Sequence, residues 1–427
     1  MVLKELYQLY LKSGQKFTTD SRAIEVGSIF FALKGERFDG NKYADAAIEQ
    51  GSSFVVVDDG TVVRDDRYIL VDDVLATMQE LAQYHRRQFT IPIIAIGGSN
   101  GKTTTKELLK SVFEVGSKVH ATKGNFNNLI GVPITLLEMP LDTDFGVIEI
   151  GTNTFGEIEK LCTMVEPNYG IITNIGKEHL EGFGDIEGVT REESELYHYL
   201  KKQDGFAFVN ADDPILLNMS RRLSKKQSFA INNEAELEGT LLQSFPEIIL
   251  RVDEIEITSS LCGSYNAENI LAVYAMAKHF GISSAQIIEG IAQYKSSNNR
   301  SEYLEIGSNK IILDAYNANP SSVAKALNSF REVESVNKYL FLGDMLEMGD
   351  YSEIEHRAII DLAAEMPNCK ALFVGTHFAK AAEGTSAMCF DEMDNLADYM
   401  ESQKIENAWL LIKGSRGIRM EKVLDLL

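Results

Sequence analysis

A glycine-rich turn between an apolar run and a helical pattern constrains this chain more than any other sequence feature. The segment reads IIAIGGSNGKTTTKE from Ile93, so a strand-like run leads through the turn into a helix that starts near Lys102. Such a turn presents backbone N–H groups and a helix N-terminus to phosphate oxygens, while Lys102 adds a positive charge and Thr103 can hold Mg²⁺. The spacing is GxxxGKT, one residue shorter than the general pattern, because Ile96 stands where that pattern has glycine. The residues expected to bind nucleotide phosphates are Gly98, Ser99, Asn100, Gly101, Lys102, Thr103 and Thr104.

The length of the chain predicts how many domains it has, and its net charge argues against some kinds of partner. A chain of 427 residues is too long for one ordinary domain and predicts two or three. The 63 acidic residues exceed the 41 basic ones, for a formal net charge of -22, and such a field repels nucleic acid and anionic membrane surfaces. We therefore expect no nucleic-acid partner, and any anionic substrate must be met by local basic residues.

Neither the cysteines nor the first residues predict export or a membrane anchor. The four cysteines contain no CxxC pair, which argues against a zinc site or a disulfide framework. Residues 2–10 place their apolar side chains on one helical face, which predicts an amphipathic helix and no signal peptide. No apolar run approaches the roughly 20 residues that a membrane helix needs. We expect a cytoplasmic, monomeric protein without membrane insertion.

Apolar runs alternate with helical patterns between residues 93 and 231. The strands expected there are Ile93–Gly97, Phe145–Ile150, Gly170–Asn174 and Phe206–Asn210, and the helices begin near Lys102, Phe155, Glu187 and Asp212. This alternation predicts a mainly parallel sheet covered by helices on both faces. Ligands of such sheets bind at the carboxyl ends of the strands, where this chain has its polar, glycine-rich segments.

Two further units flank the central one. A second alternation follows a polar join at 295–299, with strands at Ile311–Asp314, Tyr339–Gly343, Ala371–Val374 and Trp409–Lys413, helices after Pro320 and from Ser352, and a closing helix that ends at Leu427. The N-terminal part mixes helices with short strands at Ile29–Leu33, Phe54–Val57 and Tyr68–Val71. We predict an α/β protein of three domains, which span residues 1–87, 88–296 and 297–427.

A carboxylate and an imidazole are expected beside the phosphate loop. Glu149 ends one predicted strand, and His179 follows another, so both belong to the edge of the sheet that carries the loop. Such a pair could bind a divalent metal that bridges to the γ-phosphate. A histidine taken alone is more often an ordinary polar loop residue, but its place beside Glu149 favours the metal.

Several motifs, taken in order, resemble one family, the Mur ligases, which build the peptide of bacterial cell-wall precursors. They follow one another along nearly the whole chain and read GGSNGKTTTKE, NFNN with GVP, EIGTNTFGEI, TNIGKEHLEGFG, NADD, GSYNAEN, DAYNANP, LGDMLEMG and KGSR. Each motif is weak or moderate alone, and their common order makes the resemblance strong. The resemblance implies an N-terminal domain for a UDP-linked substrate, a central ATP-binding P-loop domain with a parallel sheet, and a C-terminal Rossmann-like ligase domain.

The resemblance implies an ADP-forming ligation in peptidoglycan precursor synthesis. The terminal carboxylate of UDP-N-acetylmuramoyl-tripeptide attacks the γ-phosphate of ATP, and the amine of D-alanyl-D-alanine then displaces phosphate from the acyl phosphate. Because two anions meet in the first step, catalysis depends chiefly on cations. By resemblance, Lys102 stabilises the transferring phosphoryl group and Thr103 holds Mg²⁺ on the β- and γ-phosphates. Glu149 and His179 hold a second Mg²⁺ near the acyl oxygen.

The resemblance also assigns nucleotide contacts outside the phosphate loop. Asn269, with Asn266 beside it, would contact adenine, although on sequence alone both asparagines could cap a helix. Arg300 and Asp314 would bind the ribose and phosphates of ATP, although Arg300 could equally be a solvated charge.

The substrates would contact a further set of polar residues. Arg22 and Lys34 are cations in an acidic chain and are expected to bind the diphosphate of the UDP-linked substrate. The glycines near Lys34 could equally form a simple β-turn. The residues that the resemblance places around the substrates are Ser21, Arg22, Lys34, Gly35, Asn125, Asn127, Asn128, Asn317, Asn319, Lys413, Ser415 and Arg416.

One residue departs from the family pattern at the expected second metal. The family usually has a lysine there, carbamoylated into an anion, whereas the segment GVTREESELY places Glu193 at that position. Glutamate is already anionic but shorter, so Glu193 could supply the charge without the modification or could leave a weakened metal site. The acidic run from Glu192 to Glu195 could also be a solvated helix face.

Two other functions fit parts of the sequence. A sibling ligase that adds lysine or diaminopimelate to the dipeptide precursor usually carries an Asp-Asn-Pro-Arg-like motif, and this chain has DAYNANP and LGDMLEMG instead. A regulatory P-loop protein would bind nucleotide without catalysing a ligation, and the pair Glu149 and His179 argues against it. Phosphate release that requires both peptide substrates distinguishes a ligase from such a regulatory protein.

Overall fold

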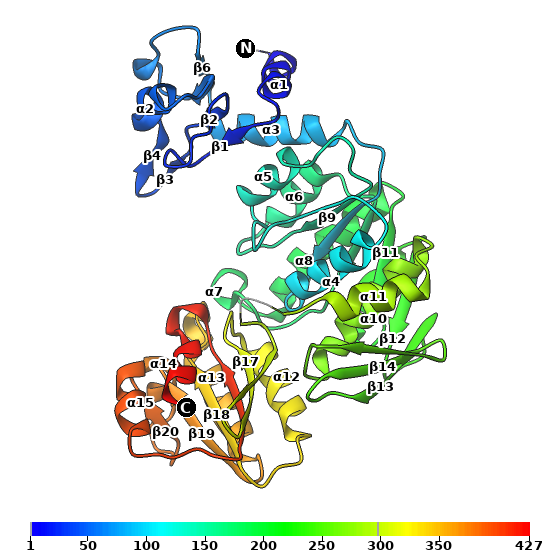
Figure 1. Ribbon diagram of the computed structural model, residues 1–427, viewed down its shortest axis with the longest axis vertical. Helices are drawn as coiled ribbons and strands as arrows, with labels where there is room; N and C mark the ends of the chain where they lie inside the picture. The colour runs from blue at the N-terminus through cyan, green and yellow to red at the C-terminus, as the bar shows by residue number, and fades with distance from the viewer. Residues whose placement is uncertain (1, 297–298) are drawn as a thin grey trace.

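The computed structural model describes residues 2–296 and 299–427. Figure 1 shows three tiers stacked along the long axis, with the N-terminal residues at the top and the C-terminal residues at the bottom. Each tier is built around its own sheet, of four, nine and six strands. The polar join predicted at 295–299 includes residues 297 and 298, which lie outside the described residues. The predicted domain limits at 87 and 296 stay a proposal.

The N-terminal tier is a parallel four-stranded sheet in the order β1-β2-β5-β6. Its strands are β1 (Phe17–Thr18), β2 (Ile29–Phe31), β5 (Phe54–Val57) and β6 (Tyr68–Leu70), with a small hairpin of β3 (Lys34–Gly35) and β4 (Phe38–Asp39). Its helices are α1 (Leu3–Lys12), η1 (Gly40–Tyr43), α2 (Ala44–Glu49), η2 (Gly60–Val62) and α3 (Val74–Arg86). The amphipathic helix predicted at the start of the chain is confirmed as α1, which buries Leu6, Tyr7 and Tyr10.

The central tier is a nine-stranded sheet in the order β15-β14-β13-β12-β11-β10-β7-β9-β8. The strands are β7 (Ile93–Gly97), β8 (Val119–Ala121), β9 (Phe145–Glu149), β10 (Tyr169–Ile172), β11 (Phe206–Asn210), β12 (Lys226–Ala230), β13 (Leu237–Gln243), β14 (Ile248–Val252) and β15 (Ile255–Ser259). The strands from β8 to β13 pair in parallel, as predicted. The antiparallel extension through β14 and β15 was not expected from the sequence.

Helices cover both faces of the central sheet. They are α4 (Lys102–Glu114), α5 (Gly131–Leu137), α6 (Glu157–Val165), α7 (Leu180–Phe183), α8 (Ile186–Lys202), α9 (Pro214–Met219), η3 (Ser220–Arg222), α10 (Tyr265–His279) and α11 (Ser284–Gln293). Successive residues of β7 point to opposite faces, as in any strand. Ile93 and Ala95 therefore enter the core beneath α3, α5, α6 and α8, whereas Ile94 and Ile96 enter the core beneath α4, α10 and α11.

The C-terminal tier is a six-stranded sheet in the order β16-β17-β21-β18-β19-β20, parallel except for the edge strand β16. The strands are β16 (Glu302–Ile306), β17 (Asn309–Asp314), β18 (Lys338–Gly343), β19 (Cys369–Val374), β20 (Met388–Phe390) and β21 (Trp409–Lys413). The helices are α12 (Pro320–Arg331), η4 (Gly349–Tyr351), α13 (Ser352–Ala364), α14 (Thr376–Ala381), α15 (Met393–Met400), η5 (Arg416–Ile418) and η6 (Met420–Leu426). The predicted closing helix is thus the 3₁₀ segment η6.

Two helices begin two residues later than the sequence predicted, because of the residues that precede their first turns. The helix expected near Asp212 begins at Pro214, because Asp213 accepts hydrogen bonds from the first turn and proline suits the first helical position. The helix expected near Phe155 begins at Glu157, after Gly156 adopts a left-handed φ of 86°. Both shifts are set by the capping residue rather than by the apolar pattern.

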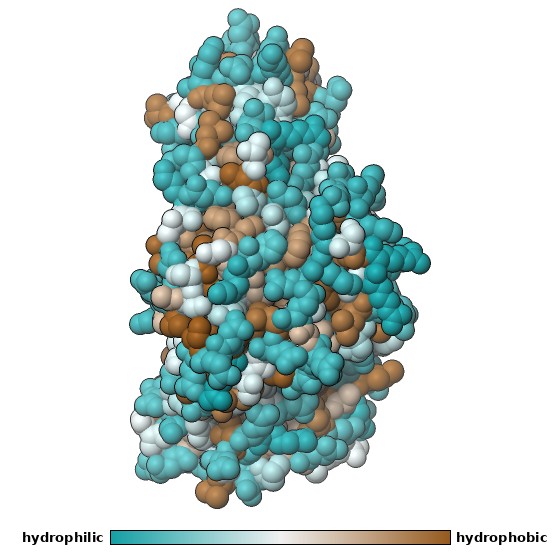
Figure 2. Space-filling view, turned by 90° about the vertical axis from the view of Figure 1, so that its right-hand side faces the viewer, coloured by the Kyte–Doolittle hydropathy of each residue, from teal (hydrophilic) through white to brown (hydrophobic). Residues whose placement is uncertain are grey.

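The surface agrees with the absence of a membrane-spanning pattern. Figure 2 shows a face that is mostly hydrophilic, with apolar side chains in small groups and no continuous apolar band. Within residues 2–296 and 299–427, none of the helices has the length and apolar character to cross a membrane.

Candidate active site

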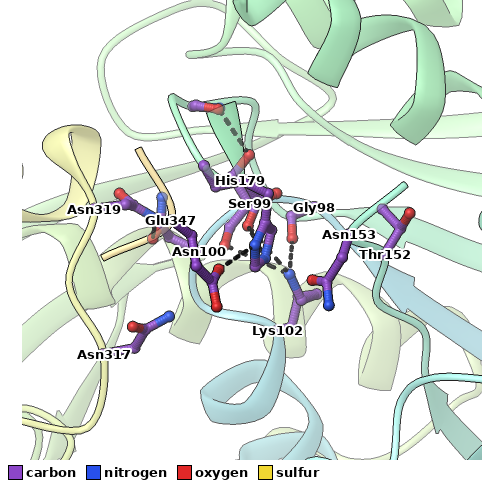
Figure 3. A network of polar contacts seen from close by, with 12 residues as sticks. Gly98, Ser99, Asn100, Lys102, Thr152, Asn153, His179, Asn317, Asn319 and Glu347 are labelled. Atoms are coloured by element: carbon purple, nitrogen blue, oxygen red, sulfur yellow. Dashed lines mark hydrogen bonds and ion pairs between the residues drawn. The ribbon is translucent and has the colours of Figure 1, made fainter. Parts of the chain in front are cut away.

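A polar cavity of about 440 Å³ lies between the central and C-terminal tiers, at the carboxyl ends of β7, β9 and β10. This is the edge of the sheet at which the sequence predicted ligand binding. The predicted residues that line the cavity are Ser99, Asn100, Gly101, Lys102, Thr103, Thr104, Asn125, Asn127, Asn128, Glu149, His179, Asn266, Asn269, Arg300, Asp314, Asn317, Asn319 and Lys413. Figure 3 shows part of this polar network.

The phosphate loop is held in shape by close backbone packing. Gly98 and Gly101 have left-handed φ angles of 107° and 85°, which favour glycine. A Cβ atom at Gly98 would lie 2.5 Å from the Thr173 hydroxyl, and one at Gly101 would lie 2.6 Å from Asn269 Oδ1. The loop also bonds the segment after β10, where the Ser99 hydroxyl accepts a 2.8 Å hydrogen bond from the backbone N–H of Gly176. These contacts within the protein hold the loop in one shape.

Lys102 is folded back onto its own loop. Its ammonium donates a hydrogen bond to the Gly98 carbonyl and lies 3.7 Å from the Glu178 carboxylate. Burial disfavours the charged form, but the surrounding carboxylates, Glu178 first, outweigh it and raise the pKa of Lys102. The lysine therefore stays a cation at the mouth of the phosphate loop.

Glu149 lies at the end of β9, beside polar groups of α4 and of the loop that contains Asn127. Its Oε1 accepts hydrogen bonds from Asn127 Nδ2 at 2.8 Å and from the Thr103 hydroxyl at 3.2 Å. Its Oε2 is buried without a hydrogen bond, with the ammonium of the buried Lys106 at 3.4 Å. The carboxylate thus has one oxygen beside the loop threonine and one without a hydrogen bond, and carboxylate oxygens are suitable ligands for a hard divalent cation.

His179 lies just before α7 and points toward the C-terminal tier. Its Nδ1 is 2.5 Å from the Glu347 carboxylate, and its Nε2 is 3.9 Å from Glu178. The side chain is 21% exposed. The side chain is thus partly buried, and the choice between a metal ligand and an ordinary polar loop histidine stays open.

Glu193 is on the buried face of α8 and is 1% exposed, so the solvated-face alternative is wrong. Its Oε2 accepts a 2.7 Å hydrogen bond from the Gly98 N–H, and its Oε1 is buried without a partner. Burial raises the pKa of Glu193 to about 7, with the Lys102 charge acting in the opposite direction. The neighbouring Glu192 is also buried and bonds the backbone N–H groups of Gly156 and Ile158 at the start of α6.

The structure does not bring the predicted metal ligands into one cluster. Across the part of the chain that the structure describes, no group of three or more His, Cys, Asp or Glu side chains is placed to hold a metal ion. Glu149, His179 and Glu193 each have separate partners, as given above. Thr103 and Glu149 are close enough to share a cation, and the full set of four ligands stays a prediction.

The predicted adenine contacts are internal to α10. The N-cap of α10 is Ser264, so the alternative in which Asn266 and Asn269 cap the helix is wrong. Asn269 donates to Asn266 Oδ1 at 3.0 Å, and its Oδ1 accepts from the Thr105 hydroxyl at 3.3 Å. Asn269 therefore ties α10 to the phosphate-loop helix at the cavity wall, whereas Asn266 bonds Asn269 and the Cys262 carbonyl.

The C-terminal wall of the cavity is also held by buried bonds. Arg300 is partly buried against Tyr316, with its guanidinium 3.5 Å from the ring centre, so it is not a purely solvated charge. Asp314 accepts a 3.2 Å hydrogen bond from the Ser301 N–H and a 2.6 Å bond from Lys413, which is 2% exposed. Lys413 therefore neutralises Asp314 and holds this wall together.

Three further predicted substrate residues lie near the same wall. Asn319 reaches across the cavity and donates a 2.9 Å hydrogen bond to Asn100 of the phosphate loop. The Ser415 hydroxyl accepts from the Leu346 N–H at 3.0 Å and so supports the loop after β18. Arg416 is exposed and lies 5.5 Å from the Tyr316 ring centre.

The predicted UDP-binding residues lie apart from the cavity, in the N-terminal tier. Arg22 binds Asp20 through two hydrogen bonds of 2.9 and 2.7 Å, which lower the pKa of that carboxyl to about 2. Lys34 pairs with Asp58 at 2.8 Å, beside Gly35 in the β3–β4 hairpin. The predicted set Ser21, Arg22, Lys34 and Gly35 is not part of the cavity lining.

Comparison with known proteins decides the family. Three sequence profiles match in order, described as "Mur ligase family, catalytic domain" over residues 16–92, "Mur ligase middle domain" over 96–277, and "Mur ligase, glutamate ligase domain" over 299–416. A Bacillus subtilis (strain 168) protein named UDP-N-acetylmuramoyl-tripeptide–D-alanyl-D-alanine ligase is 34% identical over 95% of this chain and 91% of its own length. The chain belongs to the Mur ligase family.

Other relatives agree with this assignment. An Escherichia coli (strain K12) protein with the same name is 31% identical over 96% of this chain and 93% of its own length. A crystal structure of MurF from Acinetobacter baumannii matches with a TM-score of 0.88 and 29% identity, covering 98% of both chains. The predicted α/β architecture of three domains, with a central parallel sheet and a Rossmann-like C-terminal domain, is confirmed for this Mur ligase.

Sequence reasoning missed several residues of the Mur ligase cavity. Glu178 and Lys106 surround the predicted catalytic groups, and Glu347 contacts His179. All three stand inside motifs that carried the family resemblance, namely KEHLEGFG, GKTTTKE and LGDMLEMG. Their positions in those motifs were the available signal, but their partners become visible only in the folded chain.

Proposed function

We propose that this Mur ligase joins D-alanyl-D-alanine to UDP-N-acetylmuramoyl-tripeptide and converts ATP to ADP and phosphate. The observation that supports the proposal is the cavity at the end of the phosphate loop. Lys102, Thr103 and Glu149 lie together in its lining. The substrates are those printed in the names of relatives that span more than nine-tenths of their own length with this chain.

The proposed reaction has two steps. The terminal carboxylate oxygen of the tripeptide attacks the γ-phosphorus, the bond to ADP breaks, and an acyl phosphate forms. The neutral amine of D-alanyl-D-alanine then attacks the acyl carbon, phosphate leaves with the bonding electron pair, and the amine loses a proton. Because the first step brings two anions together, the Lys102 ammonium supplies the main electrostatic stabilisation once it leaves the Gly98 carbonyl.

Mg²⁺ is part of the proposal. Thr103 and Glu149 would hold it, since their oxygens lie 3.2 Å apart and are ligands of the kind that Mg²⁺ prefers. His179 and Glu193 complete the proposed ligand set. When bound, Mg²⁺ would neutralise phosphate charge during phosphoryl transfer.

The remaining binding roles follow from the positions of polar groups. Arg300, Asp314, Asn266 and Asn269 line the cavity, and we assign them to nucleotide binding. The other proposed roles are substrate contacts for Asn125, Asn127, Asn128, Asn317, Asn319, Lys413, Ser415 and Arg416, and UDP contacts for Ser21, Arg22, Lys34 and Gly35. We also propose a cytoplasmic monomer, and the four unpaired cysteines support the cytoplasmic location.

Phosphate release from purified protein tests this function. The proposal requires release that depends on ATP, UDP-N-acetylmuramoyl-tripeptide and D-alanyl-D-alanine together, with the pentapeptide product detected by mass spectrometry. Activity with the dipeptide precursor and lysine or diaminopimelate instead would support a sibling ligase. Nucleotide binding without any peptide-dependent release would support a regulatory P-loop protein.

A further inference from the structure

His179 and Glu347 form a contact between two domains that differs from an ordinary surface ion pair. His179 precedes α7 of the central domain, and Glu347 lies in the loop between β18 and η4 of the C-terminal domain, with Nδ1 and Oε2 2.5 Å apart. Figure 3 shows the two side chains together at the edge of the phosphate-loop network. We name this contact the His179–Glu347 clasp.

The backbone on both sides of the clasp has an uncommon conformation. His179 has a φ of 45° and Glu347 a φ of 63°, in the left-handed region that side chains other than glycine rarely adopt. The loops also touch directly, since the Glu181 N–H donates a 3.2 Å hydrogen bond to the Glu347 carbonyl. A Cβ atom added at Gly349 would lie 3.2 Å from the Glu181 Cα. The two loops therefore fit each other closely, and this fit sets the direction of both side chains.

The clasp leaves one imidazole nitrogen for the cavity. A carboxylate beside one ring nitrogen favours the proton on that nitrogen and fixes the plane of the ring. Here Glu347 faces Nδ1, whereas Nε2 is 3.9 Å from the nearest carboxylate, that of Glu178, which is beyond a hydrogen bond. His179 lines the cavity, so its Nε2 is the nitrogen that can act on a ligand there.

From this geometry we infer that Glu347 is a positioning residue, which orients His179 only while the C-terminal domain is docked on the central domain. Docking of that domain and completion of the active site thus become one event. The inference rests on the proposed function, and it assigns to Glu347, which also lines the cavity, a role that acts through His179.

The same interface supplies a matched control. Lys177 and Glu355 also pair across the two domains at 2.5 Å, two residues away from His179, and Glu355 is not part of the cavity lining. A carboxylate that only holds the domains together should behave alike in both pairs. Glu347→Ala and Glu355→Ala therefore separate positioning from docking, and Glu347→Gln keeps an acceptor oxygen without the charge.

The first measurement uses the metal-free, nucleotide-free full chain. Histidine ¹⁵N labelling reports which ring nitrogen carries the proton, and the His179 signals are assigned with His179→Gln. We expect the same His179 ring-nitrogen signals in the wild type and in Glu355→Ala, altered signals in Glu347→Ala, and partial retention of the wild-type signals in Glu347→Gln. Unchanged His179 signals in Glu347→Ala would overturn the inference whatever the enzyme catalyses.

The second measurement is steady-state kinetics on variants whose folding is verified by thermal unfolding. Loss of a residue that orients a metal-binding histidine typically costs about 10- to 100-fold in activity or metal affinity. We therefore expect Glu347→Ala to lower kcat and to raise the Mg²⁺ concentration at half-maximal rate, with partial rescue by Glu347→Gln. Glu355→Ala should change mainly the KM for ATP. Equal effects in the two alanine variants would show that the His179–Glu347 clasp only holds the domains together, and would overturn the inference. Absence of D-alanyl-D-alanine-dependent turnover in the wild type would instead contradict the proposed function.

Discussion

The central and N-terminal domains of this Mur ligase hold their cations in opposite ways. Lys102 in the central domain is nearly enclosed, lies against a rigid glycine loop and faces several carboxylates. Arg22 and Lys34 in the N-terminal domain are exposed, and each is paired with a single aspartate. Charges act strongly where water is excluded and weakly where it is not. Single substitutions of these cations should therefore change turnover in the central domain, and only the affinity for the substrate in the N-terminal domain.

The largest expected effect is that of Lys102→Ala. Removing the cation that faces the transferring phosphoryl group should lower kcat by orders of magnitude, while the glycine loop keeps its fold. Lys110→Ala is the matched control, because Lys110 lies two turns further along α4 and pairs only with Glu114 on the surface. A folded Lys102→Ala variant that keeps more than about a tenth of the wild-type kcat, a loss below about 1.4 kcal/mol of barrier, would break the comparison.

The next prediction tests whether the buried site at the phosphate loop needs the negative charge of the Glu193 carboxylate. Glu193→Gln should weaken the hydrogen bond from Gly98 and raise the Mg²⁺ requirement or lower turnover markedly. Wild-type activity should not depend on bicarbonate, because the Glu193 carboxyl, whose pKa burial raises to about 7, ionises without carbamoylation. Glu193→Lys should then recover part of the activity only when bicarbonate is supplied.

The control for this experiment is the adjacent residue. Glu192→Gln replaces a buried carboxylate that bonds the start of α6 and the Thr152 hydroxyl but not the phosphate loop, so it should lower the melting temperature without changing the Mg²⁺ titration. If Glu193→Gln follows the wild-type Mg²⁺ curve, Glu193 supports the phosphate loop alone and the proposed metal depends on the other ligands.

The smallest expected effect is that of Arg22→Ala. Because exposed ion pairs contribute little, we expect the KM for the UDP-linked substrate to rise by less than about tenfold, with kcat unchanged and a smaller effect at high salt. Arg67→Ala is the matched control, since Arg67 repeats the same two-residue spacing and bidentate geometry with Asp65 in the same domain. Equal KM values in the two variants would show that Arg22 does not contact the diphosphate.

Much of the fold could be predicted because local signals were strong. The strand at Ile93–Gly97 and the helix at Lys102 follow from an apolar run, a glycine turn and helical periodicity, and the structure has both at those bounds. The antiparallel extension over residues 237–259 was missed, because its last two strands continue the sheet in a direction that the βα rhythm does not predict.

The active site was predictable only in its local parts. The phosphate loop and Glu149 follow from short motifs at strand ends. The partners of Glu193 and His179 do not, because Gly98 is 95 residues from Glu193 and Glu347 belongs to another domain. Such contacts depend on how α8 packs on the sheet and on how two domains dock, and neither is encoded in a local pattern.

The most direct test of the central claim follows an oxygen atom. If the tripeptide carboxylate attacks the γ-phosphate, one of its oxygens must leave with phosphate when D-alanyl-D-alanine displaces the acyl phosphate. Tripeptide precursor labelled with ¹⁸O in its terminal carboxylate should therefore give phosphate that carries one ¹⁸O atom per turnover, measured by mass spectrometry. Unlabelled phosphate from a productive ligation would contradict the acyl-phosphate route and the role proposed here for Lys102.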